Sequence, residues 1–209
     1  MSTAHDVTTL EGLLALYGEP NPNSLAKEAP CLTAAYRDWL ARTSFFAMAT
    51  AGAGGLDCTP RGDAPGQAFR ILDDRTLAIP DRRGNNRLDS LRNIVSDPRI
   101  ALLFLIAGVN ETLRINGRAR ITGDPALLES FSVEGKLPAS VILVEIQSVY
   151  YQCARALSRA RLWDPAAHVG RQEVPTAGQM SKSARRDPDA FDAEAYDASL
   201  SKRMQDSLY

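Results

Sequence analysis

The chain has 209 residues, of which 44% are hydrophobic and 23% charged, a composition ordinary for a globular domain with a substantial core. Its net charge is −1 at pH 7 and its pI about 6.1, so bulk charge gives no reason to expect nucleic acid or a membrane as partner. Three widely spaced cysteines without a CxxC pair exclude a disulfide framework and a zinc knuckle, and favour buried free thiols. No apolar run approaches the ~18 residues of a membrane span. The N-terminus lacks a signal-peptide pattern, so we expect a cytoplasmic protein.

Two helices are predicted near the N-terminus. The first is indicated by apolar residues at helical spacing, which are Val7, Leu10, Leu14 and Tyr17. Gly18 is a suitable C-terminal stop for it. After a linker with two prolines, Ser24 can cap a second helix that runs through Leu40. We expect these helices to form an extension, residues 1–43, that packs on the outside of another structure.

Short strands follow the helices at residues 44–50, 56–60, 69–72 and 76–80. The first two are joined by a glycine-rich tip, residues 51–55, which is typical of a hairpin turn. This tip lacks the Lys-Ser/Thr pair of a phosphate-binding P-loop, and no helical pattern follows it.

Helical spacing then begins at Asn86 and ends before Pro98. Residues 99–106 are almost uniformly apolar, which predicts a central strand buried on both faces. Residues 111–121 alternate between apolar and polar side chains, and Asp124 with Pro125 is expected to open a short helix. Residues 139–151 form a further strand. Near the C-terminus a last helical stripe comprises Ala193, Tyr196, Leu200, Met204 and Leu208.

The count is six or seven short strands with a few helices and no alternation of strand and helix. This pattern favours a mainly β fold, a small antiparallel barrel with helical decoration, over a doubly wound parallel sheet. We expect the barrel to span residues 44–165. Residues 166–209 are predicted to form a helical tail that packs on the barrel or on a second subunit.

A basic loop at the start of the predicted central helix is the first candidate for function. Arg82, Arg83, Arg87 and Arg92 stand there against a single carboxylate, Asp89. Cations at a helix N-terminus oppose the helix dipole unless an anion lies between them. A phosphate would resolve this arrangement, because backbone N–H groups and guanidinium groups both bind it. A plain basic surface and a contact with nucleic acid remain open from spacing alone.

The sequence shows no hydrolytic machinery. Its only histidines, His5 and His168, lie outside the predicted barrel strands, so a Ser-His-Asp triad, a Cys-His pair or a histidine-rich metal site has little to draw on. We therefore predict no metal site. If the chain is an enzyme, a cofactor is expected to supply the chemistry.

A combined pattern runs through the middle of the chain in the segments PRGDAPG (60–66), FRIL (69–72), LAIPDR (77–82), GNNRLDSLRNI (84–94) and DPR (97–99). CARAL (153–157) and RLWDP (161–165) follow it. Together these segments resemble the pyridoxamine 5'-phosphate oxidase-related FMN-binding split-barrel superfamily, and within it a bacterial branch of predicted flavin-nucleotide-binding proteins. The resemblance is best over residues 40–165.

The resemblance implies a split antiparallel β-barrel and a homodimer with two FMN sites at the subunit interface. The residues that it places at the cofactor are Arg70, Ile71, Ile79, Pro80, Asp81, Arg82, Asn85, Asn86, Arg87, Thr112 and Trp163. Residues 79–81 correspond to positions beside the ring or ribityl chain, whereas Arg82 and residues 85–87 correspond to a phosphate clamp. Thr112 aligns with a glutamine that reaches the flavin from the other subunit. Trp163 corresponds to an aromatic residue near the flavin, with a core tryptophan as the alternative.

One departure bears on the activity. The vitamin B6 oxidases of this superfamily hold their substrate with an arginine and a histidine near the C-terminus, but residues 158–163 here contain no histidine. We therefore do not predict pyridoxamine phosphate oxidation. The expectation is an FMN-dependent oxidoreductase for an unknown small molecule or electron donor, without an assigned catalytic residue. A flavin-binding sensor or carrier without turnover, and a deazaflavin-dependent reductase, are the alternatives.

Overall fold

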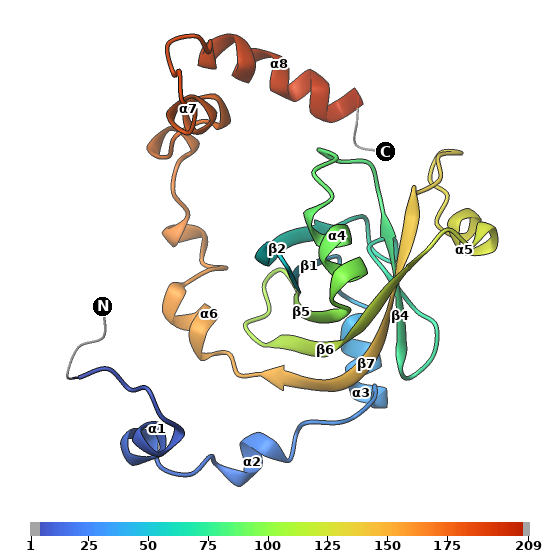
Figure 1. Ribbon diagram of the computed structural model, residues 1–209, viewed down its shortest axis with the longest axis vertical. Coiled ribbons are helices and arrows are strands. Elements are labelled where there is room, and N and C mark those ends of the chain that lie inside the picture. Colours follow the sequence, from blue (N-terminus) through green and yellow to red (C-terminus); the bar gives the residue numbers. More distant parts are fainter. Residues whose placement is uncertain (1–4, 207–209) are drawn as a thin grey trace.

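The protein, described over residues 5–206 by a computed structural model, contains seven β-strands in that range. The strands are β1 (Phe45–Gly52), β2 (Gly55–Gly62), β3 (Arg70–Ile71), β4 (Thr76–Asp81), β5 (Arg99–Leu105), β6 (Thr112–Thr122) and β7 (Ser140–Gln152). They form one sheet in the order β2-β1-β5-β6-β7-β4-β3, and every neighbouring pair is antiparallel (Figure 1). The predicted mainly β class and antiparallel arrangement are therefore confirmed.

Helices flank the sheet and extend from both of its ends. They are α1 (Leu10–Tyr17), α2 (Pro22–Leu25), α3 (Ala34–Leu40), α4 (Asp89–Ser96), α5 (Pro125–Ser130), α6 (Arg155–Ala160), α7 (Ala177–Ser183) and α8 (Ala193–Asp206). Two of the predicted helix ends are confirmed. Gly18 follows α1 with φ 67°, and Asp124 caps α5 by accepting a hydrogen bond of 3.0 Å from the Leu127 amide.

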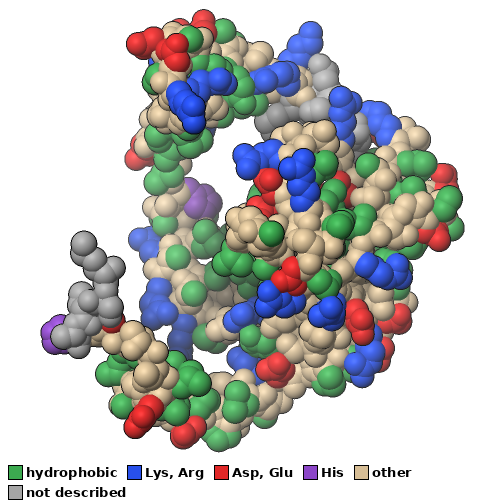
Figure 2. Space-filling view, in the orientation of Figure 1, with side chains coloured by type: hydrophobic (Ala, Val, Ile, Leu, Met, Phe, Trp, Pro, Cys, Tyr) green, Lys and Arg blue, Asp and Glu red, His purple; other side chains and the backbone are tan. Residues whose placement is uncertain are grey.

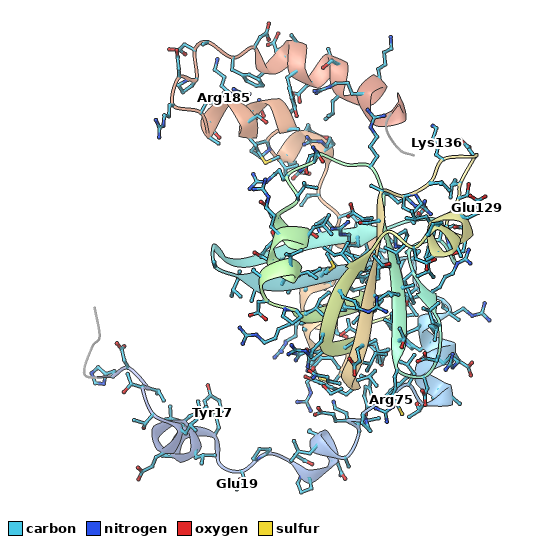
Figure 3. All side chains as sticks on the ribbon, turned by 45° about the vertical axis from the view of Figure 1, so that its right-hand side comes forward. Tyr17, Glu19, Arg75, Glu129, Lys136 and Arg185 are labelled. Atoms are coloured by element: carbon cyan, nitrogen blue, oxygen red, sulfur yellow. The ribbon has the colours of Figure 1, made fainter. Side chains whose placement is uncertain are left out.

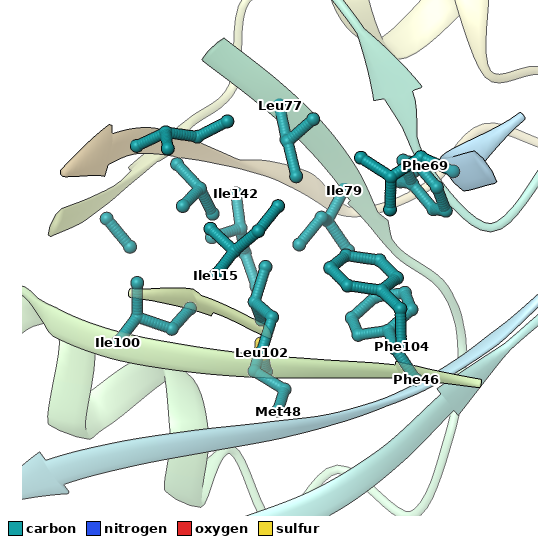
Figure 4. Packing of buried hydrophobic residues seen from close by; sticks show 14 of the residues in the cluster. Phe46, Met48, Phe69, Leu77, Ile79, Ile100, Leu102, Phe104, Ile115 and Ile142 are labelled. Carbon is teal, nitrogen blue, oxygen red and sulfur yellow. The ribbon is translucent and has the colours of Figure 1, made fainter. Parts of the chain in front are cut away.

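The sheet curls into a split barrel around one hydrophobic core (Figure 4). Phe46 on β1 meets Phe69, which precedes β3 at the other end of the strand order, with ring centroids 5.9 Å apart. Phe104 on β5 lies 4.9 Å from the first ring and 5.1 Å from the second. These aromatic contacts join the two ends of the sheet, because each ring buries its area against the others.

The alternation predicted for residues 111–121 is confirmed on β6. Inward side chains such as Ile115 are buried, whereas outward ones such as Arg114 are exposed. The pairing of β6 with β7 shifts register between Asn116 and Gly117. A Cβ atom at Gly117 would lie 2.1 Å from the Glu145 carbonyl oxygen, so the close approach of the two strands requires glycine there.

The predicted helix from Ser24 to Leu40 is wrong, because the chain divides there into α2 and α3. Between them Ala29 pairs with Val149 of β7 through two backbone hydrogen bonds of 2.9 and 2.8 Å. Pro30 explains the interruption, since the residue before a proline is disfavoured in the α-helical conformation. Thr33 then caps α3 through the Tyr36 amide.

Two expectations about burial are also wrong. β5 is buried on one face only, because the curled sheet is a single layer; the outward side chain of Leu103 is 37% exposed. The cysteines are not buried either. Cys31 is partly exposed, and Cys58 and Cys153 are exposed. All three are free thiols.

The two ends of the chain lead away from the barrel in Figure 1. α1 stands apart at the N-terminal end, and α7 with α8 forms a hairpin at the C-terminal end. Leu208 of the predicted last stripe lies outside the described residues, as does the side chain of Met204. The division of the chain at residues 43 and 165 stays a prediction, and Leu32 and Leu40, from the predicted extension, are buried in the barrel core.

None of the helices within residues 5–206 is long and apolar enough to cross a membrane.

Candidate functional site

A cleft of about 980 Å³ lies at the end of the barrel where β2, the end of β4 and the start of α4 meet. It is lined by residues 57–61 of β2, residues 81–91, Leu137, Ala139 and Ser140. Figure 2 shows Lys and Arg side chains gathered at this end of the barrel, around the connection between β4 and α4. The volume lies within the range of small-molecule and cofactor sites.

The connection from β4 to α4 comprises residues 82–88, and its part from Arg83 to Leu88 is called the cleft loop below. Asn86 and Leu88 have positive φ angles of 57° and 61°, so the loop contains two left-handed residues just before the helix. Helix α4 consequently begins at Asp89 and not at Asn86 as the spacing predicted. Leu88 occupies the N-cap position, and no side chain caps the helix. The first N–H groups of α4 therefore lie uncapped beside the cleft.

The start of α4 is fixed to the hairpin beneath it by side-chain hydrogen bonds. The buried Ser90 hydroxyl donates to Asp57 at 2.6 Å, and the Asn93 amide nitrogen donates to the Thr50 hydroxyl at 3.2 Å. A Cβ atom at Gly52 would lie 2.2 Å from the Asn93 side chain, so the hairpin tip can approach the helix only as glycine. These contacts hold the helix N-terminus in place at the wall of the cleft.

Two ion pairs, called the seam below, close the split of the barrel. Arg61 on β2 donates to Asp81 at the end of β4 at 2.9 Å, and Arg82 donates from Nε to Asp63 just after β2. β2 and β4 are not sheet neighbours, because four strands stand between them in the strand order. The Arg82–Asp63 pair is the more buried, with side chains 15% and 5% exposed. Arg82 also donates to the carbonyl of Phe131 at 3.0 Å.

The arginines of the cleft loop are more exposed than those of the seam. Arg87 pairs with Asp89 at 2.7 Å, but its side chain is 73% exposed. The hydrogen bond that Arg87 donates to the Asp89 carboxylate raises the pKa of Arg87 above its ordinary value, so the side chain remains charged. Arg83 is exposed and has no ion pair or hydrogen bond with any residue from 5 to 206. The cleft loop thus presents two accessible guanidinium groups beside the uncapped helix.

The structure brings five of the eleven predicted residues to the cleft. They are Asp81, Arg82, Asn85, Asn86 and Arg87. The carboxylate of Asp81 and the guanidinium of Arg82 are both engaged in the seam. Asn85 accepts a hydrogen bond of 3.1 Å from the Arg87 amide through its side-chain oxygen, which shapes the loop.

The other six predicted residues do not line the cleft of one chain. Ile79 and Pro80 are buried within β4, and Ile71 packs against the core. Arg70 on β3 points to α5, where its guanidinium lies 4.8 Å from the Phe131 ring and donates to the Ser130 carbonyl.

Thr112 is 3% exposed at the start of β6. Trp163 is half-buried after α6, and its indole N–H donates to the Val109 carbonyl at 2.8 Å. Their roles at a cofactor stay predictions.

Sequence reasoning gave no role to the turn from Arg61 to Gly66, and it left out Asp57 and Ser90. A signal for the seam was present, because Arg61 and Asp63 after one strand mirror Asp81 and Arg82 at the end of another. The first pair has the basic residue before the acidic one, and the second pair has the acidic residue first. Once the two strand ends are known to meet, this order predicts one ion pair between Arg61 and Asp81 and another between Asp63 and Arg82. The contact of Ser90 with Asp57 has no comparable sequence signal.

Comparisons with known proteins decide the family. The family model described as pyridoxamine 5'-phosphate oxidase matches residues 32–153, which is more than half of the chain. The chain belongs to the pyridoxamine 5'-phosphate oxidase family. The match runs from just before α3 to the end of β7, so it contains the whole barrel and the cleft. α1, α2 and the elements from α6 onward lie outside it. No curated protein matches the chain significantly.

Solved structures resemble the chain at low identity. HupZ from Group A Streptococcus is 17% identical, covers 56% of this chain and 92% of its own, and gives a TM-score of 0.46. An FAD binding protein from Mycobacterium smegmatis is 16% identical over 59% of this chain and 97% of its own, with a TM-score of 0.41. General Stress Protein 26 from Bacillus anthracis is 15% identical over 52% of this chain and 84% of its own, with a TM-score of 0.40.

Proposed function

We propose that the chain is an FMN-binding flavoprotein that acts as an oxidoreductase on a small molecule. Membership of the pyridoxamine 5'-phosphate oxidase family supports a flavoprotein of the oxidoreductase type. The observation that carries the proposal is the uncapped N-terminus of α4 beside the exposed guanidinium groups of Arg83 and Arg87. An FMN phosphate fits this donor set, since backbone N–H groups and guanidinium groups stabilise a phosphate dianion.

The chain's own residues would bind and orient the cofactor. Residues 85–87 with Arg83 would hold the phosphate, and the end of β4 at Ile79 and Pro80 would approach the ribityl chain or ring through its backbone, since both side chains are buried. Asp81 and Arg82 would support that edge through the seam. Bound FMN would supply hydride or electron transfer at its ring, so the protein groups here bind and do not transfer protons.

The proposal includes a homodimer with the cofactor at the subunit interface. Two observations support it. The cleft loop is exposed from Arg83 to Leu88 in one chain, and the outer face of the barrel exposes the apolar side chains of Phe45 and Leu103. A second copy would cover both. It would also bring Trp163 and the backbone at the buried Thr112, which do not line the cleft of their own chain, to the cleft of the other copy.

Extraction of the cofactor from purified protein tests the proposal. The protein should be yellow, and the small molecule released on denaturation should have the mass and absorbance spectrum of FMN. A deazaflavin would be recognised by its mass and would correct the cofactor assignment. A colourless protein that also fails to bind added FMN would overturn the proposal.

A flavin-binding carrier or sensor without turnover is the second candidate. It is favoured by one feature of the cleft, whose carboxylates Asp57, Asp81 and Asp89 are all engaged in hydrogen bonds or ion pairs and so offer no ready acid or base. Reduction of the bound flavin by NAD(P)H, followed by reoxidation with a panel of acceptors, separates the two functions. Turnover that depends on an acceptor supports the oxidoreductase, and its absence supports the carrier.

A further inference from the structure

Helix α1 exposes an apolar stripe that nothing within the described part of its own chain covers. Val7 and the helix residues Leu10, Leu13, Leu14 and Tyr17 follow the i, i+3, i+4, i+7 spacing of a single helix face. No residue of α1 is buried, and Leu10 and Tyr17 are each 80% exposed. Such a stripe is typical of a helix that packs against another surface, because a helix this short gains most of its stability from burying its apolar face.

The position of α1 leaves it away from its own barrel. Figures 1 and 3 show the helix standing apart from the barrel in two orientations, and Figure 3 labels Tyr17 on α1 and Glu19 in the linker that leads to α2. The segment is anchored at Ala29, which pairs with Val149, and at Lys27, whose ammonium lies 4.5 Å from the centre of the Tyr151 ring. The chain before Lys27 therefore forms an arm, residues 5–26, whose base is fixed beside the end of β7.

The arm is acidic as well as apolar. Residues 1–26 contain Asp6, Glu11 and Glu19 but no lysine or arginine, the first of which is Lys27. Figure 2 shows hydrophobic side chains over much of α1. Its partner surface should accordingly combine apolar area with positive charge.

The outer face of the sheet has this combination. Phe45 on β1 is 43% exposed, and Leu103 on β5 is 37% exposed. In the next strand, Arg114 pairs in register with Leu103, and Arg118 pairs with Arg99; these three exposed arginines are called the basic row below. Arg99 forms an ion pair with Asp97, and Glu145 of β7 stands opposite Arg118, so Arg114 is the member of the row without a neighbouring carboxylate in these pairings. Directly opposed residues of an antiparallel pair share a face, so the apolar patch and the basic row lie side by side on the outside of the barrel.

We infer that α1 of one copy packs on the outer face of β1, β5 and β6 of a second copy, with its apolar stripe over Phe45 and Leu103 and its carboxylates toward the basic row. The exchange is reciprocal, because each copy gives one arm and offers one face, and this satisfies the two-fold symmetry of a closed dimer. The inference rests on the second copy in the proposed function but does not depend on a bound flavin. The arm lies outside the residues that the family model matches.

Photo-crosslinking of the full-length protein tests the inference. Benzoylphenylalanine in place of Tyr17, on the stripe, should give a covalent dimer on denaturing gels after illumination. Mass spectrometry of that band should join α1 to peptides of β1 or of residues 99–118. Crosslinks confined to one chain, crosslinks to other surfaces of the partner, or no crosslink at all would overturn the inference.

A pair of matched variants adds an equilibrium measurement. Leu10→Ser with Leu14→Ser removes two side chains of the stripe, and we expect the dimer dissociation constant in sedimentation to rise at least ~tenfold. Leu25→Ser removes an equally apolar side chain that is 58% exposed but lies on α2 and not on the stripe, and it should leave dissociation within ~twofold of the original protein. Equal effects of the two variants would contradict the inference.

These outcomes are separable from those of the proposed function. A protein that binds FMN but shows no crosslink between chains overturns the arm contact alone. A crosslinked dimer that binds no flavin overturns the proposed function alone.

Discussion

The seam and the cleft loop border the same cleft and are built from the same residue types, yet they place arginine in opposite situations. In the seam, Arg61 and Arg82 are mostly buried and each is paired with an aspartate across the split of the barrel. In the cleft loop, Arg83 and Arg87 are exposed. The arginines that form one basic run in the sequence therefore divide between holding the barrel closed and lining the open cleft.

The physical cause of the difference is the position of each arginine relative to the strand ends. Arg82 comes directly after β4, where the turn after β2 brings Asp63 within reach. One residue further along, the chain has left the sheet and no carboxylate is within reach of Arg83 among the described residues. A shift of one residue thus separates a structural guanidinium from one available for binding.

The largest expected effect is on stability and comes from the seam. Asp63→Ala removes the carboxylate that pairs with the mostly buried Arg82 guanidinium, and we expect the free energy of unfolding to fall by about 3 kcal/mol. Urea denaturation measures it. Asp89→Ala breaks the exposed pair of the cleft loop and should cost less than ~1 kcal/mol. Similar losses of unfolding free energy for the two variants would show that the seam does not stabilise the fold more than the exposed pair does.

The next effect is on binding and comes from Arg87. Arg87→Ala should weaken FMN binding by about 2 kcal/mol through loss of a charge-assisted contact, with little change in stability. Arg99→Ala is the matched control, because Arg99 is also exposed and also pairs with an aspartate two residues away, but lies outside the cleft. Fluorescence titration of the apoprotein gives both affinities. Equal affinities of the two variants for FMN would mean that Arg87 does not bind the phosphate.

A smaller effect is expected from Arg83. Arg83→Ala should weaken FMN binding by about 1 kcal/mol, since its long exposed side chain loses rotamer freedom on binding the phosphate. The same titration measures this change, with a salt series beside it. A weaker dependence of FMN affinity on salt than in the original protein is expected for the variant. An unchanged salt dependence would show that Arg83 does not face the anion.

The smallest effect is a dependence of stability on pH, and it arises at Asp97, which lies outside both the seam and the cleft loop. Hydrogen bonds from Arg99, through side chain and backbone, lower the pKa of Asp97 from 3.8 to about 2. Because the folded pKa is depressed, the stabilisation is present above pH 3.8 and is lost as pH falls toward 2. A carbon NMR titration of the Asp97 carboxylate measures the pKa, and Arg99→Gln should raise it toward 3.8. A value of 3.8 before substitution would disprove the pairing.

Periodicity and local signals predicted most of the barrel. The alternation around Ile115, the cap at Asp124 and the stop at Gly18 all act over a few residues, so the sequence contains the whole cause. The basic run was likewise visible as a candidate phosphate site. Its division into seam and loop was not, because the pairing of Arg82 with Asp63 depends on two strand ends that meet only when the barrel closes.

Burial was the least predictable property. The apolar run of β5 indicated burial on both faces, yet composition does not tell whether a second layer covers the outer face, and here Leu103 is exposed. The spacing of α1 likewise predicts an apolar face but does not tell which surface covers it. Both surfaces are consistent with cover from a second copy, which the spacing within one chain cannot specify.

A comparison of FMN with riboflavin tests most directly whether the cleft loop holds the cofactor phosphate, because the two ligands share the ring and ribityl chain and differ in that group. The apoprotein should bind FMN at least ~tenfold more tightly than riboflavin. Arg87→Ala should lower this ratio of affinities, mainly because it weakens the binding of FMN. Equal affinities for the two ligands, or a ratio that Arg87→Ala leaves unchanged, would contradict the account.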